Sequence, residues 1–118
     1  MKILYFTSTG NSLSVAKSFD EAELLSIPQL IKQKQYTIED EVVGIIIPVY
    51  IYTYPKIVKQ YLEKVNINAN YVFVIGTYGS SFGEFGKKMM KILSKRGVNV
   101  HYLNTIKWLI MLFMLDLK

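Results

Sequence analysis

Hydroxyl side chains are concentrated near the start of the chain, where residues 7–12 carry four of them within six positions. The segment ends a strand-forming run at residues 2–7 and precedes apolar residues at Leu13, Val15, Ala16 and Phe19, which suit one face of a helix. The first N–H groups of a helix have no partner within it, and with the helix dipole they form an anion site. Gly10 allows the backbone to approach a phosphate closely. The candidate phosphate ligands are therefore Thr7, Ser8, Thr9, Gly10, Asn11 and Ser12.

This loop contains no Lys or Arg, so neutral donors alone would hold its phosphate. A nucleoside triphosphatase of the Walker type needs a lysine there, and the chain has no G-x-G-x-x-G segment that would indicate a dinucleotide. A helix capped by Asn11 or Ser12 is the plainer alternative. One residue suffices for a cap, however, and the density of polar residues favours the phosphate site.

Aromatic residues gather in two later loops. Residues 48–55 read Pro-Val-Tyr-Ile-Tyr-Thr-Tyr-Pro, and residues 76–83 read Gly-Thr-Tyr-Gly-Ser-Ser-Phe-Gly. Stacking of a planar ring on such side chains contributes about 0.5–1.5 kcal/mol per aromatic beyond the area buried. The candidate ring-binding residues are Tyr50, Ile51, Tyr52, Thr77, Tyr78 and Gly79.

Two continuous apolar runs, at residues 42–49 and 71–77, are typical of strands that are covered on both faces. Shorter strands are predicted at residues 2–7, 23–27 and 98–106, with Pro28 ending the second. One helix is predicted directly after the hydroxyl-rich residues 7–12, a second at residues 55–65 and a third at residues 82–95. Gly97 is predicted to cap the third helix in a left-handed conformation. We predict no regular element for the polar stretch at residues 29–40.

This alternation predicts an α/β fold, a three-layer doubly wound five-stranded parallel sheet. In such sheets ligands bind beyond the carboxyl ends of the strands, where the strand order reverses. The three loops follow Phe6, Pro48 and Ile75. We therefore expect all three to meet at one edge of the sheet.

Composition narrows the function classes. The 118 residues predict one domain, and the absence of cysteine excludes disulfides, thiolate metal sites and a cysteine nucleophile.

The longest apolar run, at residues 108–115, is shorter than the ~20 residues that cross a bilayer, and the start is too short for a secretory signal. We therefore expect a cytoplasmic protein with no membrane span. The net charge of +5 permits an acidic partner, but a single Arg argues against nucleic-acid recognition.

The hydroxyl loop (residues 7–12), the tyrosine loop (residues 48–55) and the Gly-Thr-Tyr-Gly loop (residues 76–83), in this order on five strands, resemble flavodoxin. More narrowly, Thr-Gly-Asn-Ser at residues 9–12 and Pro-Val-Tyr at residues 48–50 are similar to the flavodoxin-like half of flavodoxin–ferredoxin fusion proteins of anaerobic bacteria and archaea. The resemblance covers residues 2–107 and implies the strand order 2-1-3-4-5 with bound flavin mononucleotide (FMN). We therefore divide the chain into a flavodoxin-like domain at residues 1–107 and an atypical apolar tail at residues 108–118.

The resemblance also implies a role for each candidate residue. The residues from Thr7 to Ser12 would hold the phosphate of FMN, Tyr50 or Tyr52 would cover one face of the flavin ring, and Tyr78 would cover the other. Thr77 and Gly79 would offer backbone groups to the pyrimidine edge. The implied task is electron transfer with a redox partner protein, either of the ferredoxin type or a reductase. No acid–base pair or metal-ligand cluster appears in the sequence, so no catalytic or metal residue is predicted.

The sequence departs from this family in three respects. The cysteine-rich iron–sulfur segment of the fusion proteins is absent, and the loop at residues 50–53 lacks the usual glycine. The tail at residues 108–118 replaces the expected polar loop and final helix, so the last helix is predicted to be missing or replaced, as in a truncated or frame-shifted product. An exposed apolar tail would also permit a homodimer.

Three functions remain open from the sequence. An FMN-binding electron-transfer protein is the first, and an FMN-dependent reductase of a small molecule such as a quinone is the second. The third is a decayed flavodoxin fold that acts only as an interaction module, which the tail and the glycine-free loop favour.

Overall fold

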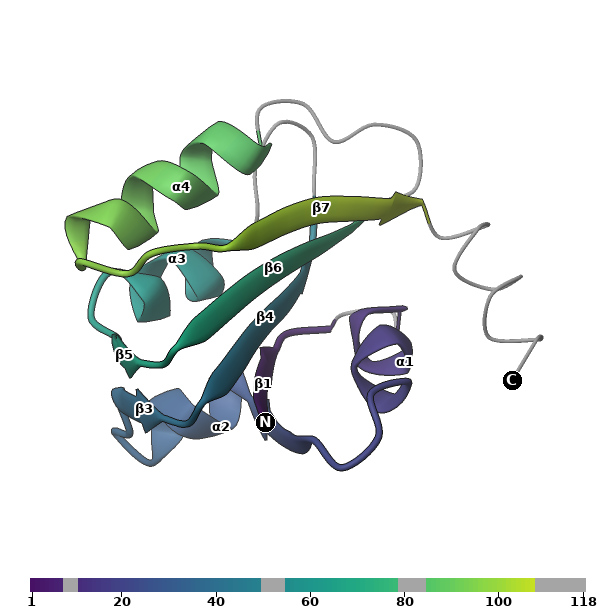
Figure 1. Ribbon diagram of the computed structural model, residues 1–118, viewed down its shortest axis with the longest axis horizontal. Coiled ribbons are helices and arrows are strands. Elements are labelled where there is room, and N and C mark those ends of the chain that lie inside the picture. Colours follow the sequence, from purple (N-terminus) through teal and green to yellow (C-terminus); the bar gives the residue numbers. More distant parts are fainter. Residues whose placement is uncertain (8–10, 50–54, 79–84, 108–118) are drawn as a thin grey trace.

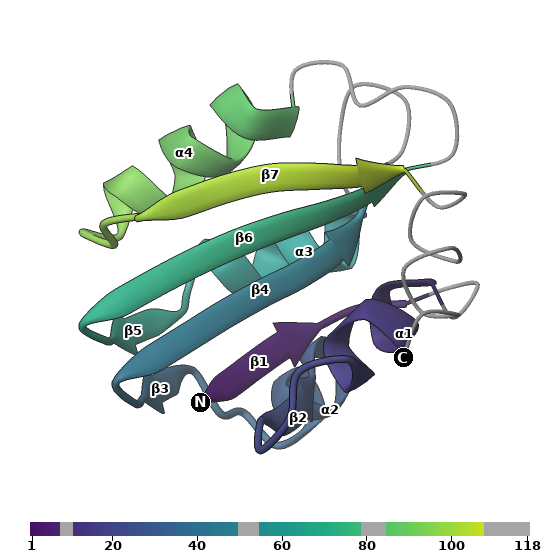
Figure 2. The ribbon, with the colours of Figure 1, turned by 45° about the vertical axis from the view of Figure 1, so that its right-hand side comes forward.

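The computed structural model describes residues 1–7, 11–49, 55–78 and 85–107. Its centre is a five-stranded parallel sheet in the order β2-β1-β4-β6-β7 (Figures 1 and 2). The strands are β1 (Lys2–Tyr5), β2 (Glu23–Ser26), β4 (Val42–Pro48), β6 (Tyr71–Tyr78) and β7 (Tyr102–Lys107). Counted along the five strands predicted from the sequence, this is the order 2-1-3-4-5. The predicted fold class and strand order are therefore confirmed.

Helices cover both faces of the sheet. They are α1 (Asn11–Lys17), α2 (Ile27–Lys32), α3 (Lys56–Leu62) and α4 (Phe85–Lys95). Side chains of α2, α3 and α4 join one buried cluster, and side chains of α1 join the other, on the opposite face. A separate two-stranded parallel sheet pairs β3 (Thr37–Glu39) with β5 (Asn66–Asn68).

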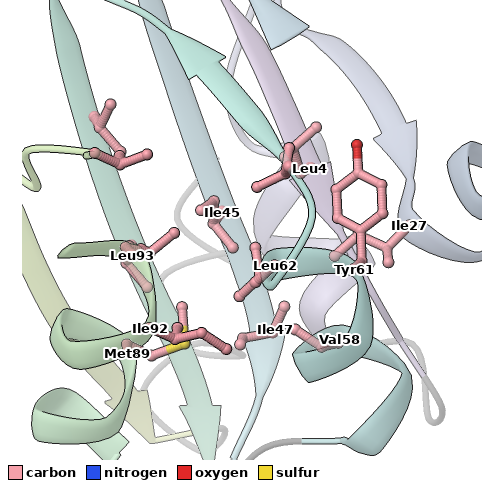
Figure 3. Close-up of a cluster of buried hydrophobic side chains, with 14 of the residues drawn as sticks. Leu4, Ile27, Ile45, Ile47, Val58, Tyr61, Leu62, Met89, Ile92 and Leu93 are labelled. Atoms are coloured by element: carbon pink, nitrogen blue, oxygen red, sulfur yellow. The ribbon is translucent and has the colours of Figure 1, made fainter. Parts of the chain in front are cut away.

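The larger core lies between the sheet and the helices α2, α3 and α4. Alternate residues of β4, including Ile45 and Ile47, point to this side and are fully buried. Figure 3 shows them facing Leu62 of α3 and Met89 and Leu93 of α4. Because β4 also buries Ile46 on the other face, its sequence is apolar throughout.

The smaller core lies under α1 and depends on a close approach between two strands. Gly44 of β4 is in register with Phe73 of β6, and a Cβ built on Gly44 would lie 2.2 Å from the Phe73 ring. Phe19, which follows α1, stacks on the same ring at 5.3 Å between centroids. Gly44 therefore gives the Phe73 ring room to lie flat between the sheet and Phe19.

The polar stretch at residues 29–40 is better ordered than the sequence predicts. Pro28 lies in the first turn of α2 and does not end a strand there, and the second strand stops at Ser26. Leu30 and Ile38 are buried in the larger core, so tertiary contacts stabilise α2 and β3 although their sequences carry weak local signals. The prediction of an irregular stretch was wrong, and β5 was not predicted at all.

Two further boundaries can be compared with the sequence. Gly97 has a φ of 74°, and Val98 N–H donates to the Leu93 carbonyl at 3.0 Å, which confirms the predicted left-handed cap. The last strand begins at Tyr102, four residues later than predicted. His101 precedes it and accepts a hydrogen bond at Nδ1 from Val72 N–H at 3.1 Å, a structural role.

The predicted tail at residues 108–118, and with it the replaced last helix, lies outside the described residues. Among the residues that are described, no helix combines the length and hydropathy needed to span a membrane.

Substitution of Gly44 tests the close approach to Phe73. We expect Gly44→Ala to lower the free energy of unfolding by about 1–3 kcal/mol, because the added methyl displaces a buried ring. Denaturant unfolding measures the effect. In a Phe73→Leu background the same substitution should cost clearly less, and equal costs in both backgrounds would contradict the proposed clash.

Tyr61 of α3 gives the fold a defined response to alkaline pH. Its ring is buried and its hydroxyl donates to the Gln35 carbonyl at 2.9 Å. Burial, and secondarily the neighbouring Tyr36, raises the pKa of Tyr61 to about 12 from 10.0. Since the unfolded chain ionises first, the contribution of Tyr61 to stability is complete below pH 10 and is lost as the pH rises through 12.

Tyr61→Phe should cost about 1 kcal/mol at neutral pH through the lost hydrogen bond. It should also flatten the fall in unfolding free energy above pH 10, relative to the native protein. Denaturant unfolding across the alkaline range, with Tyr102→Phe as the exposed control, gives the comparison. Parallel pH profiles for native protein and Tyr61→Phe would contradict the assignment.

Candidate functional site at the carboxyl edge of the sheet

The carboxyl ends of β1, β4 and β6 lie next to one another because all three strands are parallel neighbours. From β1 the chain passes to β2 on one side, whereas β4 and β6 lie on the other side (Figure 2). The strand order therefore reverses at β1, which is where doubly wound sheets bind ligands. The three loops singled out in the sequence leave from these three strand ends, so the fold places their starts at one edge.

Backbone hydrogen bonds fix the strand ends relative to one another. Phe6 N–H donates to the Ile46 carbonyl at 3.2 Å, and Val49 N–H donates to the Thr77 carbonyl at 2.7 Å. The last bond extends the pairing of β4 and β6 one residue beyond Pro48. The tyrosine loop therefore begins from a backbone position that β6 holds in place.

A buried hydroxyl pair joins the start of α1 to the end of β6. Ser12 Oγ lies 3.1 Å from Thr77 Oγ1, and either oxygen can donate. The two residues are 1% and 3% exposed although 65 positions separate them. Since α1 begins at Asn11, Ser12 lies in the first turn, and its hydroxyl faces Thr77. This pair holds α1 against the carboxyl end of β6.

The start of α4 is fixed by a second close approach. Phe85, the first residue of α4, is fully buried, and its ring would lie 2.8 Å from a Cβ on Gly76. A side chain larger than hydrogen at Gly76 would also meet Val49 at 2.7 Å. Because Gly76 has no side chain, both Val49, which follows β4, and Phe85 of α4 can pack against β6 at this position.

The structure describes five of the twelve predicted site residues. Thr7 lies two residues after the end of β1 and is half-buried, Asn11 opens α1, and Tyr78 closes β6. Ser12 and Thr77 are in contact with each other. The remaining predicted residues lie outside the described residues, namely Ser8, Thr9, Gly10, Tyr50, Ile51, Tyr52 and Gly79.

The sequence analysis missed two positions at this edge. Lys107 ends β7 in register with Tyr78, and Gly76 accommodates Phe85. Lys107 had a usable signal, since it directly follows the last predicted strand at residues 98–106. Gly76 had none, because the ring that it accommodates comes from a residue nine positions later whose orientation depends on the helix.

Negative charge is missing from the described residues of this edge. The described residues directly flanking the three loops include no Asp or Glu, and no group of three or more potential metal ligands occurs among the described residues. The pKa of Asp40 is lowered by a hydrogen bond from Glu41 N–H and by the Met1 amine, but Asp40 precedes β4 at the opposite edge. The described part of the edge therefore offers neutral polar groups and lysines, such as Lys56 and Lys107, but no carboxylate.

The chain has the same architecture as several solved structures. It is similar to a flavoprotein in complex with FMN from Lactobacillus acidophilus NCFM, with a TM-score of 0.63 and 14% identity over 88% of this chain and 91% of that one. It is also similar to two-electron reduced flavodoxin from Megasphaera elsdenii, with a TM-score of 0.61 and 14% identity over 88% and 83%. A third similar structure is the azoreductase AzrA, with a TM-score of 0.54 and 10% identity over 91% and 87%.

A scan of protein-family models and a search of the curated proteins gave no match. At 10–14% identity the solved structures establish the fold of the chain. The chain is thus a doubly wound α/β protein, and its fold is the flavodoxin-like fold.

The Ser12–Thr77 pair can be tested by a double-mutant cycle. Ser12→Ala should cost about 1–2 kcal/mol of unfolding free energy, because it leaves the Thr77 hydroxyl buried without its partner. Thr77→Val should cost a similar amount. The double variant should recover about 1 kcal/mol relative to the sum of the two single effects.

Denaturant unfolding of the four proteins measures the cycle, and Ser94→Ala, at an exposed position of α4, serves as the hydroxyl control. Strict additivity of the two single effects would show that the hydroxyls do not stabilise each other.

Proposed function

We propose that this protein binds FMN at the carboxyl edge of its sheet and serves as a flavodoxin-like redox protein. The observation that carries the proposal is that the three polar and aromatic segments begin at the neighbouring carboxyl ends of β1, β4 and β6, where the strand order reverses. The similarity to a flavoprotein in complex with FMN and to a flavodoxin supports it.

The described residues at the edge are compatible with a bound phosphate. Thr7, Ser12 and Thr77 are neutral hydroxyl residues, and no described carboxylate directly flanks the loops to repel a dianion. The Ser12–Thr77 bond holds the first turn of α1 in place before any ligand arrives. A site held in its binding conformation in advance loses less entropy on binding.

In this proposal the residues from Thr7 to Asn11 bind the phosphate through backbone N–H groups and hydroxyls. Because the structure directs the Ser12 hydroxyl to Thr77, the contribution of Ser12 to the phosphate site is its backbone N–H. Tyr50 or Tyr52 covers one face of the flavin ring and Tyr78 the other, which excludes water from both faces. Thr77 and Gly79 offer backbone groups to the pyrimidine edge.

The flavin would supply one-electron and hydride-level redox chemistry, while the protein supplies binding, orientation and electrostatics. We further propose that the chain exchanges electrons with a separate redox partner protein, since it has no cysteine for an iron–sulfur cluster of its own.

A second candidate function is an FMN-dependent reductase of a small molecule. The similarity to the azoreductase AzrA favours it. The two functions differ in a simple readout, because a reductase consumes NAD(P)H with its small substrate and without a second redox protein.

Comparison of FMN with riboflavin tests the phosphate site directly. Purified protein reconstituted with FMN should be yellow and should quench flavin fluorescence, and FMN should bind at least about 100-fold more tightly than riboflavin. The factor follows from several hydrogen bonds to a charged phosphate at about 1.5–3 kcal/mol each.

Ser8→Ala and Thr9→Ala should each weaken FMN binding by about tenfold or more and leave riboflavin binding unchanged. Ser94→Ala, at the far end of α4, should alter neither. Equal affinities for FMN and riboflavin in the native protein would contradict a phosphate site in the hydroxyl loop. A protein that stays colourless with added FMN would favour the interaction module.

A further inference from the structure

Positive charge is concentrated on one side of the molecule. The helices α3 and α4, with the residues that directly follow them, hold eight of the 14 Lys and Arg residues and one of the nine Asp and Glu residues. The eight cations are all exposed, and they are Lys56, Lys59, Lys64, Lys87, Lys88, Lys91, Lys95 and Arg96. The rest of the chain has more acidic than basic residues, so this cationic surface accounts for the net charge of +5.

A groove runs between the two helices within this cationic surface. It has a volume of about 550 Å³ and is lined by Lys59 and Glu63 of the α3 side and by Lys88, Lys91 and Lys95 of α4. Ile92, which is 8% exposed, contributes an apolar part of the lining. The three lysines of α4 are spaced three and four residues apart, so they lie on one side of the helix.

Within residues 1–7, 11–49, 55–78 and 85–107, ion pairs do not account for these lysines. The salt bridge between the Met1 amine and Asp40 is the only one among the described residues, so no described carboxylate lies within 4.0 Å of a groove lysine. Arg96 is used differently, since it donates to the Val65 carbonyl at 3.1 Å and to Asn66 Oδ1 at 2.7 Å. Like charges three or four residues apart destabilise a helix by about 0.2–0.5 kcal/mol per pair. The lysine row thus lowers the stability of α4.

The cationic surface begins at the candidate functional site. Residues 50–54 precede α3, whose first residue is Lys56, and residues 79–84 precede α4, whose first turn contains Lys87 and Lys88. Both helices lie on the same face of the sheet and run from its carboxyl edge (Figures 1 and 2). A partner seated along the two helices would therefore also reach the carboxyl ends of β4 and β6.

We propose that this cationic surface is the docking site for a redox protein with a carboxylate-rich surface. The proposal rests on the proposed function for the identity of the partner as a redox protein. Lysine is a strongly hydrated point charge, which suits long-range attraction of an acidic protein. Arg, with its planar fork of donors, is the preferred side chain for nucleic-acid recognition, and the one Arg here is already bonded to the chain.

Charge reversal on α4 tests the docking site. The probe is an acidic [2Fe–2S] ferredoxin, titrated into the native protein at low and at physiological ionic strength. The matched variants are Lys88→Glu/Lys91→Glu/Lys95→Glu and Lys17→Glu/Lys32→Glu/Lys34→Glu, which change the net charge equally. The second set is exposed and does not line the groove.

We expect saturable binding that weakens with salt, a loss of about tenfold or more in affinity for the α4 variant, and a smaller loss for the control. No saturable binding to the ferredoxin, or equal losses in both variants, would overturn the proposal. Tighter binding of a short DNA duplex than of the ferredoxin would also overturn it and assign the surface to nucleic acid.

The titrations are run with and without added FMN, and flavin absorbance is measured for every variant. Ferredoxin binding by a protein that does not take up FMN would refute the proposed redox function and leave an acidic-protein docking surface. FMN binding without ferredoxin binding would refute the docking site alone.

Discussion

Burial of β4 and β6 on both faces is the constraint on which the rest of the structure depends. Two adjacent strands of this kind have no polar face, so helices must cover them from both sides. Strands that are joined by such helical crossovers run parallel, and their carboxyl ends therefore lie at the same edge of the sheet. The location of the candidate site follows from this arrangement, because loops that are far apart in sequence leave from neighbouring strand ends.

The same constraint explains which elements could be predicted from the sequence. The runs at 42–49 and 71–77 are continuous because both faces of each strand are buried, whereas the strand order was implied by the resemblance to flavodoxin. In contrast, α2 has six residues and β3 and β5 have three each. Segments this short have little stability of their own, and their order comes from contacts such as Leu30 and Ile38 with the core. Pro28 was ambiguous for a related reason, since proline both ends strands and opens helices.

The candidate site was predictable to the level of its loops but not to the level of its hydrogen bonds. Residue types and spacing identified the hydroxyl loop and the two aromatic loops, and the topology places their starts together. The Ser12–Thr77 contact depends on where α1 begins and on the pairing of Thr77 with Pro48. Neither is encoded in a local pattern. The sequence predicts the Ser12 hydroxyl as a phosphate ligand. In the structure this hydroxyl is buried against the Thr77 hydroxyl, and Ser12 thereby positions α1.

The positions of the lysines along α3 and α4 do not follow from what would stabilise these helices. A cation in the last turn of a helix, such as Lys95, interacts favourably with the helix dipole. A cation in the first turn does the reverse, at a cost of about 0.3–1 kcal/mol, and Lys56, Lys87 and Lys88 all occupy first turns that contain no acidic residue. These three lie at the ends of the helices closest to the carboxyl edge. Their positions are unfavourable for the helices and favourable for attracting an anionic group or an acidic surface toward the loops, which ties the charge of the molecule to its site.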